Sequence, residues 1–409
     1  EGSSGASVPG TKCPIYGYLC MNIPGFNFNR HRWLAISAGI LTVLALKVIP
    51  DPGTFSLVYA DDAWPKTDFS RTIVNVDEII AGGPRRDDIP AIDVPKFVDS
   101  SRADQWLNDR EPVIVVALKR AARAYPLQIL MYHEIVNDRI ADIPLTVTFC
   151  PLCYTSIVFS RRVDGNVLDF GTTGRLRNSD LVMYDRQTES WWQQFTGEAI
   201  AGFYAGQKLE QLPGSIVAYE TFKQQFPDGE ILSRDTGFSR PYGQNPYRGY
   251  DDINDRPFLY RGTIDDRLPP MERVIGLNIN GQTKIYPLSI VNDLRVINDV
   301  VENEPVAVFS KPGMLSVLDK SVIGESRTIP AAKIYSTTLD GRQLTFGLNN
   351  GKIVDLQTGS TWNMFGTAIA GQLIGRSLKS LDLGVHFAFA WLAFRPDTQI
   401  YKLPGDSLR

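Results

Sequence analysis

Short apolar runs separated by turn residues dominate the chain, and this pattern predicts a β-rich protein. Residues 113–118 form an apolar run rich in β-branched side chains, as expected of a buried strand. Asp164-Gly165 and Asn280-Gly281 are dipeptides that favour hairpin turns. By the same criteria, further strands are expected at residues 145–149, 156–162, 167–170, 181–184 and 274–279.

Three segments carry apolar side chains at near-helical spacing and predict short helices. They span residues 127–136, 219–226 and 288–296. Residues 121–126 are expected to interrupt the chain between the first strand and the first of these helices.

The segment from Tyr125 to Pro151 recurs from Tyr286 to Pro312 without a gap, at an offset of 286 − 125 = 161. A second block that begins at Asp185 recurs from Asp355, at an offset of 355 − 185 = 170. Two repeats are too few for a solenoid, so a packed pair is the better expectation. The predicted fold is therefore α+β and β-rich, with two pseudo-symmetric copies of one barrel- or sandwich-like unit and few short helices.

The repeats also predict where the chain divides. Each boundary follows either the repeated blocks or a change in composition. The expected parts are an N-terminal extension with a signal peptide or membrane anchor (1–60), an entry segment (61–104), the first repeat (105–214), a connecting insert (215–264), the second repeat (265–396) and a tail (397–409).

The N-terminal part predicts export. Arg30 and Arg32 precede an uncharged, largely apolar run at residues 33–46, which has the length of a signal-peptide core. Val58-Tyr59-Ala60 places small or apolar residues where a signal peptidase would cleave after Ala60. The alternative is an uncleaved membrane anchor at residues 33–49. Both hypotheses place the remaining chain outside the cytoplasm, in the periplasm or at the cell surface.

Composition and charge exclude several classes of function. The 409 residues carry a net charge of −3 with mixed signs, and no basic stripe indicates a nucleic-acid partner. The common motifs of phosphate-binding loops, zinc proteases and serine hydrolases are absent from the sequence. Four cysteines and three histidines leave few soft metal ligands.

Only the first repeat carries a cysteine pair. At the repeat offset, Cys150 falls opposite Lys311 and Cys153 opposite Met314. Strand patterns on both sides indicate that the pair lies at a hairpin tip rather than at a helix start, where redox thiols are activated. The pair could form a disulfide, act as a redox thiol, or bind a soft metal such as copper(I). Copper(I) could be held by the two thiolates alone or together with Met183, His133 or His386.

Polar residues that the second repeat lacks indicate a working face on the first repeat. Arg186, Glu189 and Gln193 are replaced there by Leu356, Gly359 and Asn363. A group of arginines and aspartates could clamp an anion, or its members could pair with one another and tie strands together. They are Arg175, Arg177, Asp180, Asp185 and Arg186. The tyrosines of the insert could cover a cleft, because each has an apolar face and a polar tip. The candidate ligand-binding residues are Arg175, Arg177, Asp180, Asp185, Arg186, Glu189, Trp192, Gln193, Tyr242, Tyr247 and Tyr250.

Two motifs resemble a known family. The segment Thr148-Phe-Cys-Pro-Leu-Cys and the long motif that starts at Arg177 are similar to the bacterial family called domain of unknown function 3179, over roughly residues 75–396. Tyr154 departs from the resemblance, which leads us to expect a small residue such as glycine after the second cysteine. The resemblance implies an exported protein and implies no reaction.

Two hypotheses for function follow. The first is a soft-metal (copper) or thiol-redox site at Cys150 and Cys153. The second is a non-catalytic module that holds a small polar or saccharide-like ligand in a cleft between the repeats. For the first, we expect the two sulfurs to lie close together beside a pocket, within about 10 Å of at least two side chains from Arg186, Glu189, Gln193 and His386.

Overall fold

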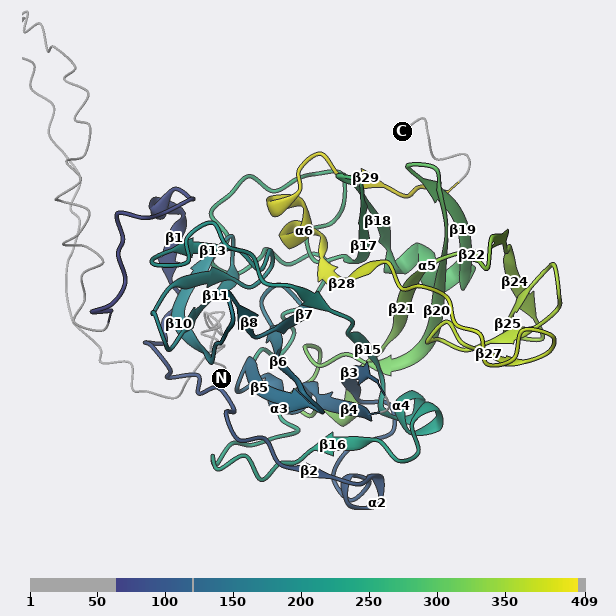
Figure 1. Ribbon diagram of the computed structural model, residues 1–409, viewed down its shortest axis with the longest axis horizontal. Helices are drawn as coiled ribbons and strands as arrows, with labels where there is room; N and C mark the ends of the chain where they lie inside the picture. The colour runs from purple at the N-terminus through teal and green to yellow at the C-terminus, as the bar shows by residue number, and fades with distance from the viewer. Residues whose placement is uncertain (1–63, 120, 404–409) are drawn as a thin grey trace, which may run out of the picture.

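The computed structural model describes residues 64–119 and 121–403, and strands far outnumber helices in them (Figure 1). The expected β-rich α+β class with few short helices is confirmed. No described helix is long and apolar enough to cross a membrane, and the predicted export segment lies outside the described residues. The α-helices are α2 (Ser100–Ala103), α3 (Leu127–Leu130), α4 (Tyr219–Gln225), α5 (Leu288–Leu294) and α6 (Ala388–Phe394), and the 3-10 helices are η1 (Val76–Glu78) and η2 (Ile323–Glu325).

Three sheets form the earlier part of the fold. The first contains, in order, β1 (Ile79–Ala81), β10 (Phe170–Arg177), β11 (Asp180–Asp185), β12 (Trp191–Gln193) and β13 (Ala199–Ala201). The second contains β14 (Gln211–Leu212), β7 (Thr155–Ser160), β6 (Ile143–Cys150) and β5 (Ile135–Ile140). The third contains β15 (Ser215–Ala218), β3 (Pro112–Leu118), β4 (Ala121–Pro126), β16 (Glu230–Leu232) and β2 (Phe97–Val98).

Three further sheets form the later part. The first of them contains β28 (Asp382–Phe387), β17 (Arg273–Ile279), β18 (Gln282–Pro287) and β29 (Gln399–Ile400). The next contains β19 (Val296–Val301), β20 (Glu304–Leu315) and β21 (Thr328–Ser336). The last contains β24 (Phe346–Asn349), β25 (Lys352–Asp355), β26 (Thr361–Trp362) and β27 (Ala368–Ala370). Two small hairpins are β8 (Arg162–Val163) with β9 (Asn166–Val167), and β22 (Thr338–Leu339) with β23 (Arg342–Gln343).

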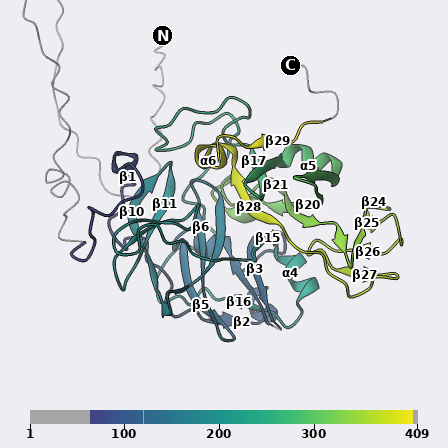
Figure 2. The same cartoon turned by 45° about the horizontal axis from the view of Figure 1, so that its top comes forward.

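The sheet that holds β10 and β11 and the sheet of β24 to β27 lie at opposite ends of the molecule in both views (Figures 1 and 2). Between them, one large cluster of buried apolar side chains runs through both parts of the chain. A smaller cluster lies beside Trp64 and Trp191, at the outer end of the first part. The shared core means that β7 and β28, far apart in the sequence, pack against each other.

Several predicted elements were wrong in detail. The strands expected at 156–162 and 167–170 are each divided, because β7 ends at Ser160 before β8 begins and β9 ends at Val167 before β10 begins. The helix expected at 127–136 is the single turn α3, because Glu134 adopts the left-handed φ of 58° and the β-branched Ile135 and Val136 begin β5. The expected interruption at 121–126 is instead the strand β4. It pairs along its full length with β3, so tertiary pairing outweighs the weak strand propensity of its alanines.

The sequence repeat is matched by the local elements. The strands β3, β4 and β5 have the same lengths as β17, β18 and β19, and each begins 161 residues earlier, as 273 − 112 = 161 shows for the first pair. Side-chain bonds recur as well: Asn137 bonds the backbone N–H and C=O of Phe170, and Asn298 bonds the same groups of Phe346. Superposition of the two segments, and the domain boundaries drawn from the repeat, stay predictions.

A buried aspartate also recurs in each segment. Asp185 accepts hydrogen bonds from Trp192 Nε1 (2.9 Å) and from the backbone N–H of Thr188 (2.7 Å). Asp355 accepts the equivalent bonds from Trp362 Nε1 (3.0 Å) and the Thr358 N–H (2.6 Å). Both aspartates are fully buried, so they fix the turn that follows their strand.

Asp185→Ala and Asp355→Ala are expected to lower the free energy of unfolding by similar amounts, about 3 kcal/mol each. Each change leaves a buried indole N–H and a turn N–H without an acceptor. Urea denaturation of the two variants and the wild type checks this. A neutral effect of Asp185→Ala alone would show that Asp185 serves a ligand rather than the core.

Candidate functional site

The cysteine pair lies at the tip of a hairpin, as its flanking strand patterns predict. Cys150 ends β6 and pairs with Thr155, the first residue of β7. Residues 151–154 make the turn, and both thiols are free and buried, with 2% and 0% of Cys150 and Cys153 exposed. The site is therefore a knuckle between two strands, and neither sulfur lies at a helix N-terminus.

The backbone at Tyr154 explains why glycine is expected there. Tyr154 has a φ of 52°, in the left-handed region that glycine adopts without steric cost. Its ring packs edge-on against Phe149 and lies 4.4 Å from the guanidinium of Arg273. These contacts offset the strain of a tyrosine at this position.

A second hairpin brings a carbonyl and a carboxylate to the sulfurs. Arg177 on β10 pairs with Asp180 on β11, and the two connecting residues, Asn178 and Ser179, have φ of 52° and 63°. Positive φ at both positions is the type I′ turn that suits the twist of a tight hairpin. The turn directs the Ser179 carbonyl at the thiols, which lie 3.2 Å away for Cys153 Sγ and 3.9 Å for Cys150 Sγ.

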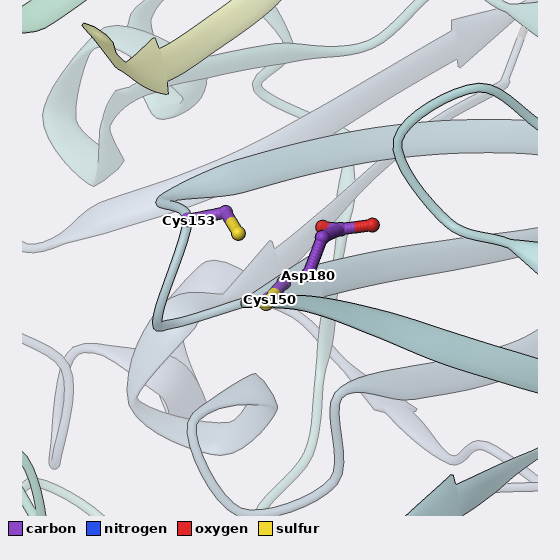
Figure 3. A group of neighbouring side chains, drawn as sticks. All are labelled: Cys150, Cys153 and Asp180. Carbon is purple, nitrogen blue, oxygen red and sulfur yellow. The ribbon is translucent and has the colours of Figure 1, made fainter. Parts of the chain in front are cut away.

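Asp180 completes a group of three metal-ligating side chains. The two sulfurs and one Asp180 carboxylate oxygen all lie within 4.8 Å of one another, and the three side chains converge (Figure 3). Asp180 Oδ2 accepts hydrogen bonds from Gln193 Nε2 (2.6 Å) and the Phe195 N–H (2.9 Å). Asp180 Oδ1 is buried and has no hydrogen-bond partner among the described residues. The carboxylate is thus held by one oxygen while the other is unused.

Glu134 adds a fourth acidic group, which the sequence did not single out. Burial, together with the charge of Asp180, raises the pKa of Glu134 to about 8. Burial raises the pKa of Asp180 to about 7 against the opposing hydrogen bond from Gln193, and it also raises the pKa of both thiols. No salt bridge between described residues reaches Glu134 or Asp180, so burial favours the protonated form of each carboxyl.

The tyrosine-rich insert covers this site. Tyr250 donates a hydrogen bond to the carbonyl of Leu152 in the cysteine turn (3.0 Å) and accepts one from the N–H of Phe258 (3.1 Å). Ser179 in the second turn donates to the carbonyl of Phe258. The insert therefore ties the two hairpin tips together above the sulfurs.

His386 approaches the site from the later part of the chain. Its Nδ1 lies 3.0 Å from Thr155 Oγ1 and its Nε2 lies 3.0 Å from the carbonyl of Leu383. The carbonyl requires a proton on Nε2, so Nδ1 accepts from the hydroxyl. Burial lowers the pKa of His386 to about 3, which keeps the ring neutral. Both nitrogens are engaged, so His386 joins the two parts of the fold rather than offering a free ligand.

The remaining candidates from the sequence lie away from the cysteines. Arg186 pairs with Asp93, and Glu189 lies 3.1 Å from Arg86. These two residues follow the far end of β11, about 17 Å along the strand from Asp180. Arg177 pairs with Glu78 at 2.7 Å, at the near end of the same hairpin. Arg177 and Arg186 thus each pair with an acidic residue outside the candidate set, rather than with Asp180 or Asp185 in one clamp.

Most of the other candidates are core or covering residues. Met183 and Trp192 are fully buried in the large apolar cluster, on neighbouring strands. Tyr242 Oη lies 2.6 Å from His133 Nε2, whose ring is buried. Tyr247 is half-buried against the same cluster, as is Tyr250. Arg175 lies on β10 opposite Val182, and its N–H donates to Thr173 Oγ1 (2.9 Å).

Two cavities lined by described residues lie elsewhere. They have volumes of about 480 Å³ and about 370 Å³, and neither is lined by Cys150 or Cys153. The pocket expected beside the sulfurs is not one of them. Two of the four side chains expected near the sulfurs are linked to the site by hydrogen bonds. Gln193 is bonded to Asp180, and His386 is bonded to Thr155.

The metal-free protein is expected to lose about 2 kcal/mol of stability between pH 6.5 and pH 8. Asp180, with a pKa of about 7, and Glu134, with a pKa of about 8, bind protons more tightly in the folded than in the unfolded chain. Their contribution to the free energy of unfolding is therefore present at low pH and is lost as the pH rises through these values. His133 and His386 have lowered pKa values and act oppositely, but only below about 6.5. Urea denaturation with a chelator measures the change, and Glu134→Gln should remove most of it. Equal loss in that variant would contradict the assignment.

Comparison with known proteins gives the family and no activity. No curated protein and no solved structure matches the chain. The family model described as a protein of unknown function (DUF3179) matches residues 86–398, which include both cysteines, Asp180 and the tyrosine-rich insert. The chain therefore belongs to the DUF3179 family of proteins of unknown function.

Proposed function

We propose that Cys150, Cys153 and Asp180 bind one metal ion, and that zinc is the best match. The observation that carries this proposal is the set of three donor atoms within 4.8 Å of one another. Asp180 also has a buried oxygen, Oδ1, without a hydrogen-bond partner among the described residues. Bonds of about 2.3 Å to sulfur and about 2.1 Å to oxygen would separate tetrahedral donors by roughly 3.5 to 3.8 Å. Small side-chain adjustments would therefore close the three donors on a zinc ion.

The charge of the site supports a divalent cation. Two thiolates and one carboxylate carry three negative charges, and the three side chains are at most 2% exposed. Ions are expensive to bury unless they are paired or bind a metal. Zinc would replace protons on the thiols and the carboxyl, so binding should release protons and strengthen as pH rises. Glu134 is close enough to raise the pKa of Cys150 through its charge and is the candidate for a fourth ligand or for a group that orients one.

The donor set favours zinc over copper(I). Copper(I) prefers sulfur and nitrogen ligands, and a carboxylate oxygen is harder than either. Met183 lies three residues beyond Asp180 on β11, about 10 Å along the strand. His386 uses both ring nitrogens in hydrogen bonds. Copper(I) on the two sulfurs alone stays the competing assignment.

The same observations argue against thiol–disulfide exchange. Exchange requires an exposed thiolate, which nearby positive charge or a helix N-terminus normally stabilises. Here burial raises the pKa of both thiols, and the neighbouring groups are acidic. The proposed role of the metal is instead to hold the two hairpin tips under the insert.

Zinc should bind with a stoichiometry of one per chain when Cys13→Ser and Cys20→Ser leave only this pair of thiols. In that background, Cys153→Ser and Asp180→Asn should each weaken zinc binding about 100-fold or more, because each removes a ligand. Competition with a chromophoric chelator gives the affinities, and circular dichroism shows that the variants are folded.

Asp142→Asn is the control, since this exposed carboxylate at the β5–β6 turn pairs with Lys119 and lies away from the donors. Zinc at 100 times its dissociation constant should stabilise the parent by about 2.7 kcal/mol. A Cys150–Cys153 disulfide in protein purified without reductant, with no metal bound, would refute the proposal.

We also propose an extracytoplasmic location, which the apolar run at 33–46 and Ala60 support. Fractionation of cells that produce the full chain should find the protein in the membrane or outside the cytoplasm. Full-length soluble protein in the cytoplasm would contradict this location and would leave the metal proposal standing.

A further inference from the structure

The cavity of about 480 Å³ has a chemical character opposite to that of the cysteine site. Helix α4 lines it from one side, and β20 with β25, β26 and β27 lines it from the other. It therefore lies where an element of the earlier part of the chain meets the sheets of the later part (Figure 1). Its volume is in the range of sites for small organic ligands.

Three cations line the cavity: Arg295, Lys311 and the exposed Lys352. Arg295 follows α5, and its Nε donates to the carbonyl of Ser310 (3.2 Å). Lys311 Nζ donates to Thr221 Oγ1 (2.9 Å) and lies 3.8 Å from the partly exposed carboxylate of Glu220. Within residues 64–119 and 121–403, no salt bridge links Arg295 to a carboxylate. The guanidinium thus brings positive charge that no described carboxylate neutralises.

Buried polar and apolar groups complete the lining. Ser310 is 1% exposed, and its Oγ has no hydrogen-bond partner among the described residues. Asn363 Nδ2 donates to Gln225 Oε1, which holds the amide at the cavity wall. Phe365 packs edge-on against Phe226, and its ring contributes an apolar wall. The cavity therefore offers cations and hydroxyls together with aromatic surface.

Arg295 and Lys311 occupy the repeat positions of two acidic groups in the cysteine site, Glu134 and the Cys150 thiol. Arg295 lies 161 residues after Glu134, and Lys311 lies 161 residues after Cys150. The backbone is alike at both places: Glu134 and Arg295 have φ of 58° and 66°. Their carbonyls accept from the Phe149 N–H (2.8 Å) and the Ser310 N–H (2.9 Å), respectively. Corresponding backbone positions thus carry a carboxylic acid and a thiol in one segment and two cations in the other.

We propose that this cavity binds a small organic anion, a carboxylate carried on an apolar body. Arg295 and Lys311 hold the carboxylate, since a guanidinium and an ammonium both form charge-assisted hydrogen bonds with it. Ser310 Oγ donates the hydrogen bond that it otherwise lacks. Phe365 and Trp362 pack against the apolar body. This site is independent of the metal proposal.

Benzoate and its neutral analogue benzamide test the assignment in titrations of the full chain followed by NMR. Benzoate should bind saturably at one site, and benzamide should bind at least about tenfold more weakly because it cannot pair with the cations. Arg295→Gln and Lys311→Met should each weaken benzoate binding by about tenfold or more. Arg376→Gln is the matched control, since this exposed arginine pairs with Asp340 outside the cavity.

Three results would overturn the anion site itself, and a fourth would overturn the organic character of its ligand. The first is equal affinity for benzoate and benzamide, and the second is a loss of binding in Arg376→Gln as large as in Arg295→Gln. The third is the absence of saturable benzoate binding up to the solubility limit. Inorganic phosphate that bound as tightly as benzoate would overturn the organic character of the ligand. Asp180→Asn should leave benzoate affinity unchanged, which separates this site from the metal site.

Discussion

Four acidic groups buried together, with no salt bridge to them from any described residue, are the constraint on which the rest of the site depends. Glu134, Cys150, Cys153 and Asp180 lie within one water-poor region, and burial raises the pKa of each. Such a cluster is stable when it is protonated or when it holds a metal, because buried charges need a partner. Asp180 Oδ2 accepts two hydrogen bonds, which fix the carboxylate in place. Its Oδ1 has no hydrogen-bond partner among the described residues, so this oxygen could bind a metal.

The structure around the cluster is built to position it rather than to expose it. Two tight hairpins deliver the sulfurs and the carboxylate, and Tyr250 and Phe258 join the hairpin tips from above. His386 fastens the underlying strand to the later part of the chain through Thr155. A bound metal would therefore cross-link turns that are already held by backbone bonds, which fits a stabilising or metal-holding role better than fast turnover.

Much of this could be predicted from the sequence, and particular residues show where prediction stopped. The flanking strand patterns correctly placed Cys150 and Cys153 at a hairpin tip, and most strands follow their β-branched runs. Residues 131–136 were assigned to a helix because their apolar spacing cannot reveal the left-handed φ of Glu134. The contact between Ser179 and the sulfurs depends on pairing between distant hairpins, which no local pattern encodes. Glu134 could have been found, since its repeat counterpart is the oppositely charged Arg295. The same comparison places the cations Arg295 and Lys311 opposite Glu134 and Cys150.

X-ray absorption at the zinc edge of the loaded protein tests the central claim most directly, because it reports the atoms bound to the metal. The account predicts two sulfur neighbours at about 2.3 Å and oxygen neighbours at about 2.0 to 2.2 Å in a four-coordinate site. The sulfur signal should halve in Cys153→Ser. A shell of nitrogen and oxygen alone, or one unchanged by Cys153→Ser, would contradict a metal centre built from Cys150, Cys153 and Asp180.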